Sequence, residues 1–101
     1  SVTESILAGL DSPPDVILAA NDDMALGAQQ VVQEQGLDIA IIGFDDAPMS
    51  QYLFPPLTTV RQPIHEAGRK CVEILIALIE GEQPSELHIL VPPQLIVRAS
   101  A

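Results

Sequence analysis

Apolar and polar residues come in blocks along the first half of the chain, and these blocks predict a strand, a helix and a second strand. Residues 16–20 (VILAA) and 39–44 (IAIIGF) are short apolar runs, typical of strands buried on both faces of a parallel sheet. Between them, residues 22–35 predict a helix that ends at Gly36. Its apolar positions share one face and are Met24, Ala28, Val31 and Val32. This order predicts a right-handed βαβ unit with parallel strands.

The flanking segments predict further elements. Residues 3–10 favour a short helix, which the prolines at 13 and 14 end. An irregular stretch over 45–57 leads to a short β-favouring segment at 58–60, and a long helix is predicted over 63–80. Cys71 falls on the apolar stripe of that helix, and we expect it to be buried. Residues 88–91 and 94–97 predict two short extended pieces.

Composition narrows the function classes. The chain has 101 residues, 48% of them hydrophobic, which is enough for one small domain with its own core. The net charge of −10 argues against direct binding of this chain to nucleic acid, because such binding needs a basic surface. No apolar run approaches the ~20 residues of a membrane-spanning helix, and no leader is evident, so we expect no membrane partner. The lone cysteine fits a reducing compartment.

Polar side chains follow both predicted central strands. Asn21 and Asp22 come directly after the first strand, and Asp45 comes directly after the second. Because parallel strands end at the same edge of a sheet, these groups would meet where open α/β sheets bind ligands. A carboxylate beside an amide suits the vicinal hydroxyls of a sugar or the edge of a purine. The same residues also suit helix capping and turn formation, so the pattern leaves both interpretations open.

Other site chemistries find little support. His65, His88 and Cys71 share no zinc-ligand spacing, and we expect no metal site. No glycine-rich phosphate loop or nucleophile elbow follows either strand, so no cofactor or catalytic residue is predicted. Arg61 and Gln62 could lie on the surface or reach a ligand.

Several local sequences, taken in order, resemble the LacI/GalR family of bacterial transcriptional repressors. They are AANDDMALGA (19–28), IIGFDDAP (41–48), YLFPPLTTVRQP (52–63) and PQLIVR (93–98). The resemblance covers nearly the whole chain from Pro14 onward. It implies an α/β fold, a parallel sheet flanked by helices, as part of a periplasmic-binding-protein-like (type I) core of two lobes.

The resemblance also implies a division of the chain. Residues 1–57 would form the βαβ unit of the carboxyl lobe and 58–63 the crossover between lobes. Residues 64–81 would be a helix of the other lobe, and 86–101 a returning extended segment. The DNA-binding headpiece of the family is absent from this chain.

By matching motifs, the resemblance implies that Asn21, Asp45 and Gln62 contact a small effector, a sugar or a nucleoside. Leu26 and Tyr52 would lie in the interface of a homodimer. Asp22 and Asp46 would be structural. The whole regulator would be cytoplasmic, would not be an enzyme, and would bind operator DNA only through the headpiece.

Two alternatives remain at this point. One is a fragment of a periplasmic sugar-binding protein, which shares the fold and would need an export leader. The other is a Mg²⁺-dependent enzyme that uses Asp22, Asp23, Asp45 and Asp46, since carboxylates suit a hard cation. The second is disfavoured because the only lysine, Lys70, lies in a helix away from this edge.

Overall fold

The computed structural model describes residues 1–101, which divide into two compact units. The first unit comprises Ser1–Arg61 and Leu95–Ala101, and the second comprises Gln62–Gln94. The boundary at Arg61 falls inside the segment 58–63, where the family resemblance implies a crossover. None of the helices is long and apolar enough to cross a membrane.

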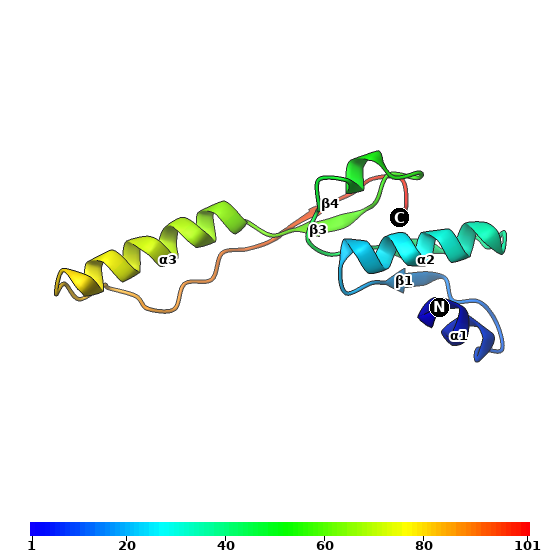
Figure 1. The fold of residues 1–101 in the computed structure, drawn as a ribbon, viewed down its shortest axis with the longest axis horizontal. Coiled ribbons are helices and arrows are strands. Elements are labelled where there is room, and N and C mark those ends of the chain that lie inside the picture. Colours follow the sequence, from blue (N-terminus) through cyan, green and yellow to red (C-terminus); the bar gives the residue numbers. More distant parts are fainter. The chain divides into compact units, whose positions relative to one another are not determined.

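A parallel βαβ unit lies at the centre of the first unit (Figure 1). It consists of β1 (Val16–Leu18), α2 (Asp22–Glu34) and β2 (Ala40–Ile42). The two strands pair in parallel, with Leu18 opposite Ile42, which confirms the predicted arrangement. Within the first unit, the βαβ unit is preceded by α1 (Val2–Ala8), whose first turn is closed by a capping box between Ser1 and Glu4.

The second edge of β2 is also occupied. Residues 58–61, which include β3 (Thr59–Arg61), run parallel to it through bridges at Ile42–Thr58 and Asp45–Arg61. The carbonyl oxygen of Ser100, near the end of the chain, accepts a hydrogen bond from the Ile41 amide (2.9 Å). The short strand β4 (Gln94–Ile96) pairs with β3. The carboxyl ends of β1, β2 and β3 therefore point the same way.

The core of the first unit lies between α2 and this sheet. Its buried members are Ala25, Ala28, Val32, Ile39, Ile41 and Leu57. Met24, predicted on the buried face, is 55% exposed, and Ala25 takes that place instead. The cause is Asp22, whose carboxylate is buried at the start of α2 and sets which face of the helix turns inward.

The expectation that both strands are buried on both faces is wrong for β1. Val16 and Leu18 are 50% and 72% exposed, while Ile17 packs against the core. Only one face of β1 is covered within this chain. In β2, by contrast, Ile41 is fully covered.

The second unit consists of α3 (Ile64–Ile79) and an extended segment that returns along it (Figure 1). A pocket of about 430 Å³ is lined by α3 together with Ile89 and Val91. No residue of α3 is buried, and Cys71 is exposed, so the prediction of a buried cysteine is wrong. The returning segment covers the apolar stripe of α3 only in part. The strand predicted over 88–91 does not form.

Candidate functional site

Asn21 and Asp45 lie at the same edge of the sheet. Each follows its strand by three residues, and the last residues of the two strands, Leu18 and Ile42, are direct partners. The segments that carry them are also joined, because the amide of Ala47 donates to Oδ2 of Asp22 (2.7 Å). The structure thus brings together two of the three residues predicted to contact ligand.

Asn21 is the N-cap of α2. Its Oδ1 accepts a hydrogen bond from the backbone amide of Met24 (2.8 Å). Because only the oxygen can accept that bond, the Nδ2 group points elsewhere, and it has no hydrogen-bond partner in the structure. Capping therefore leaves a two-proton donor available, so the two interpretations of Asn21 are compatible.

Asp22 is a buried junction rather than a cap. Only 1% of its surface is exposed. Besides the Ala47 amide, it accepts hydrogen bonds from the hydroxyl of Thr59 (2.7 Å, to Oδ1) and the hydroxyl of Ser50 (to Oδ2). These donors satisfy the charged group that burial would otherwise penalise. A Cβ atom at Gly43 would lie 2.3 Å from Oδ1, so this junction requires glycine there.

Asp45 is exposed and sits in an unusual backbone conformation. Its φ is 113°, and that of Asp46 is 53°. Side-chain-bearing residues rarely adopt such angles, and each costs about 1–3 kcal/mol unless neighbours hold it. Strain of this kind is typical of functional sites.

Asp46 anchors the same loop from the inside. Its carboxylate, 9% exposed, accepts from Nε of Arg61 (2.7 Å) and from Nη2 of Arg98 (2.9 Å). Burial by itself raises the pKa of this carboxyl, but the hydrogen bonds and charges of Arg61 and Arg98 outweigh it and hold the pKa below its ordinary value of 3.8. Asp46 therefore stays ionised and structural.

The remaining predicted residues are placed as follows. Gln62 is exposed and opens the second unit, directly after β3. Leu26 is half-buried in α2, and Tyr52, in the 3₁₀ turn η1 (Ser50–Tyr52), is 81% exposed. The Nε2 groups of Gln29 and Gln33, one and two turns beyond Leu26, donate to the carbonyls of Pro55 and Phe54. The exposed part of α2 near Leu26 is therefore continuous with the segment that follows Tyr52.

Sequence reasoning missed the supporting residues. Arg98 ends the PQLIVR motif but was given no role, and the Ser100 hydroxyl donates to the Ile41 carbonyl (2.6 Å). Thr59 was assigned only a strand preference. One signal in the sequence could have identified Arg98. The loop has two adjacent carboxylates, Asp45 and Asp46, and the nearest cation in sequence is Arg61, so a second arginine from elsewhere was to be expected.

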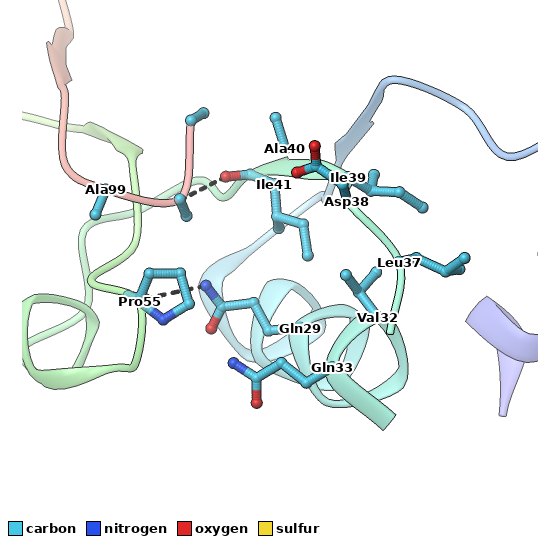
Figure 2. A pocket seen from close by; sticks show the side chains of 12 residues that line it. Gln29, Val32, Gln33, Leu37, Asp38, Ile39, Ala40, Ile41, Pro55 and Ala99 are labelled. Atoms are coloured by element: carbon cyan, nitrogen blue, oxygen red, sulfur yellow. Dashed lines mark hydrogen bonds between the residues drawn. The ribbon is translucent and has the colours of Figure 1, made fainter. Parts of the chain in front are cut away.

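A pocket of about 400 Å³ lies at the opposite edge of the sheet, before β2 (Figure 2). It is lined by residues 38–41, by α2 and by the end of the chain. The amides of Gln29 and Gln33 in its wall already donate to backbone carbonyls, and the Ile41 carbonyl is bonded to Ser100. Asp38 adds an exposed carboxylate to the lining, but both glutamine side-chain donors are already engaged. The edge with Asn21 and Asp45 offers a donor and an acceptor together and is the better candidate.

A magnesium site is not supported. No group of three or more His, Cys, Asp or Glu side chains is arranged to hold a metal ion. Moreover, the carboxylates of Asp22 and Asp46 are engaged by protein donors and cations.

Comparisons with known proteins agree with this architecture. Residues 2–101 match the family model described as periplasmic binding protein-like domain. The lactose operon repressor of Rhizobium radiobacter is 43% identical over 102 residues, covering 97% of this chain and 88% of that protein. A LacI-family regulatory protein from Chloroflexus aggregans superposes with a TM-score of 0.89 at 55% identity, over 97% of this chain and 37% of its own.

A third relative is a complex with a sugar. The cellobiose complex of the transcriptional regulator CelR superposes with a TM-score of 0.87 at 31% identity, over 98% of this chain and 31% of its own. The chain thus spans about a third of the length of both solved structures. These relatives are transcriptional regulators and not enzymes. The chain therefore belongs to the periplasmic binding protein-like domain family and, within it, to the LacI/GalR transcriptional regulators, where it corresponds to the carboxyl-terminal part of the effector-binding core.

Proposed function

We propose that this chain senses a small polar effector, a sugar or a nucleoside, for a LacI/GalR-type transcriptional regulator. The observation that supports this proposal most is the edge shared by β1 and β2. The Nδ2 donor of Asn21 and the exposed carboxylate of Asp45 both lie at this edge, and hydrogen bonds fix the backbone of both residues. A donor and an acceptor at one edge suit adjacent hydroxyl groups. The cellobiose complex of CelR supports the sugar class. Gln62 is proposed as a third contact.

The proposal assigns the regulator's other partners to surfaces outside this site. Operator DNA would be bound by a separate headpiece, because this chain carries a net charge of −10 and would repel DNA. The regulator would act in the cytoplasm. The effector would act by binding one arrangement of the core more tightly than another, because only differential affinity shifts an equilibrium. One dimer contact would be the exposed surface of α2 and η1 around Leu26 and Tyr52.

The effector site is tested by titrating the ¹⁵N-labelled chain with cellobiose and, separately, adenosine. We expect one of them to shift the amide resonances around Asn21 and Asp45, and Asp45→Asn to weaken that response. Asn21→Ser retains a capping oxygen while removing the amide donor, so it should weaken binding with little loss of stability. Asp38→Asn, a change to an exposed carboxylate at the opposite edge, is the matched control. Equal responses in all the variants would refute the assignment.

The dimer contact is tested by light scattering across a concentration series. We expect Leu26→Ala and Tyr52→Asp to lower the molar mass of the associated form. Ile79→Asp, on the exposed side of α3, reports association through the second unit instead. If only Ile79→Asp changes the molar mass, the contact assigned to α2 and η1 is wrong.

A further inference from the structure

The backbone that carries Asp45 is held by three consecutive amide groups, in the loop 45–47. The bonds run from Asp45 N to Val60 O (2.9 Å), from Asp46 N to Thr59 Oγ1 (3.3 Å) and from Ala47 N to Asp22 Oδ2 (2.7 Å). The acceptors belong to β3 and to the start of α2. Each residue of the loop is thus fixed by a separate acceptor on a neighbouring element.

Thr59 links two of these three attachments. Its hydroxyl accepts the Asp46 amide and donates its own proton to Oδ1 of Asp22 (2.7 Å). The residue is fully buried, so no water replaces either bond if the hydroxyl is removed. Valine has nearly the same shape but neither a donor nor an acceptor. Replacing Thr59 by valine would therefore release the Asp46 amide and loosen the Asp22 carboxylate at once.

The conformation of the loop depends on these attachments. The positive φ angles of Asp45 and Asp46 are unfavourable for residues with side chains, so a released backbone would relax toward negative φ. Relaxation would move the carboxylate of Asp45 away from the edge that it shares with Asn21.

We propose that Thr59, acting through Asp22 and the Asp46 amide, is a positioning residue for the effector site. It holds Asp45 in the left-handed backbone conformation that presents its carboxylate at the sheet edge. The inference rests on the proposed function, because it takes Asp45 to be an effector contact.

Thr58 provides a matched control. It is the adjacent residue, is also buried, and its hydroxyl likewise accepts and donates. Its bonds, however, come from the backbone amide of Arg98 (2.8 Å) and go to the carbonyl of Ala101 (3.2 Å), and neither bond is made to the loop 45–47 itself. The Arg98 side chain does reach Asp46, but it keeps its own bonds to Asp46 and to the Leu57 carbonyl when the Thr58 hydroxyl is removed. Thr58→Val should therefore lower stability as much as Thr59→Val does, while all three amides of the loop 45–47 keep their acceptors.

The experiment compares the full chain with Thr59→Val, Thr59→Ser and Thr58→Val by NMR. The three-bond coupling between the amide and α protons of Asp45 reports its φ, and hydrogen exchange reports the bonds of 45–47. In Thr59→Val we expect a changed coupling, and exchange at Asp46 faster by about tenfold, as for one lost hydrogen bond. The affinity for cellobiose should fall by about five- to tenfold. Thr59→Ser should resemble the unmodified chain, and Thr58→Val should change only the thermal midpoint.

The outcomes separate the two proposals. If Thr59→Val alters the coupling and exchange while the unmodified chain binds no cellobiose, the positioning role stands and the sugar class fails. If Thr59→Val leaves coupling and exchange unchanged, or lowers only the thermal midpoint as Thr58→Val does, the positioning role is overturned. Should Thr59→Val fail to fold, Ser50→Ala removes one donor from the same carboxylate, and unchanged exchange at Ala47 would then overturn the inference.

Discussion

Both long helices carry an apolar face, but their surroundings are very different. Six of the 13 residues of α2 are buried, against none of the 16 in α3. The first unit supplies α2 with a sheet and with Leu57, whereas the second unit offers α3 only an extended segment. Periodicity thus indicates that a helix has an apolar face to cover, but not whether the chain itself provides the cover.

The second half of α3 carries this contrast furthest. It is apolar almost all round, and its exposed side presents Val72, Leu75, Ile76 and Ile79. Helices of this kind are normally buried. In a complete regulator, we expect the other lobe of the core to cover this side, as the family resemblance implies. The first unit should therefore be the more stable of the two, and substitutions can test that difference.

The largest effect is expected for Leu57→Ala. Leu57 is fully buried among α2 and β2 side chains, so its truncation should lower the free energy of unfolding by about 2–5 kcal/mol. Leu75→Ala is the matched change on α3, where the side chain is half-exposed, and it should cost well under half as much. Urea denaturation followed by circular dichroism measures both. If both variants lose the same free energy of unfolding, the first unit is not the more stable of the two.

Gly43→Ala should come next, at about 1–3 kcal/mol, because the added methyl group would overlap the Asp22 carboxylate and displace it from its donors. Gly68→Ala, on α3, is the control, since nothing lies within 4 Å of a Cβ there. It should be neutral or stabilising, because alanine favours a helix more than glycine does. Thermal midpoints of the two variants test the prediction, which fails if the signs are reversed.

Asn21→Ala should cost about 1 kcal/mol through loss of the N-cap of α2. Asn21→Ser should restore most of that stability, because its hydroxyl can accept the Met24 amide. No corresponding change exists on α3, whose N-cap, Pro63, makes no side-chain hydrogen bond. Chemical denaturation of the two Asn21 variants gives the comparison, and equal losses would mean that the cap bond contributes little.

The smallest effect concerns pH. The pKa of Asp46 is lowered in the folded chain, so its ionisation stabilises the fold above the unfolded value, near 3.8. This contribution should be lost as the pH falls below 3.8 and through the folded-state pKa. Asp46→Asn should lower stability at neutral pH and flatten this part of the pH dependence. The test is the free energy of unfolding of both chains, measured between pH 2 and 7. If its decrease at acid pH is the same in Asp46→Asn as in the unmodified chain, the two arginines contribute nothing measurable to stability through Asp46.

Sequence patterns predicted the elements better than their exposure. The short apolar runs located β1 and β2, and the Asn21 cap and Gly36 bounded α2, because these signals are local. Exposure depends on what packs against a face. Local patterns therefore could not predict the exposure of Leu18, Met24 and Cys71.

The candidate site divides in the same way. Its location followed from two polar residues after two parallel strands, and the parallel pairing confirms that premise. Two of the bonds that brace it join residues far apart in sequence, 37 positions in Thr59–Asp22 and 52 positions in Arg98–Asp46. Such partners are fixed by tertiary packing, and no local spacing rule identifies them.

The interrupted first unit has a consequence for the order of folding during synthesis. Residues 95–101 complete it, and Ser100 bonds to Ile41 and Thr58 across separations of 59 and 42 residues. Bringing these segments together closes a long loop, which costs entropy and favours slower folding. On the ribosome, the Ile41 amide and carbonyl on this edge of β2 would stay unpaired until residues 95–101 emerge, although residues 58–61 could already pair with the rest of the edge. A chain cut before Leu95 would keep all three helices and still lack the segment that bonds to Ile41 and Thr58.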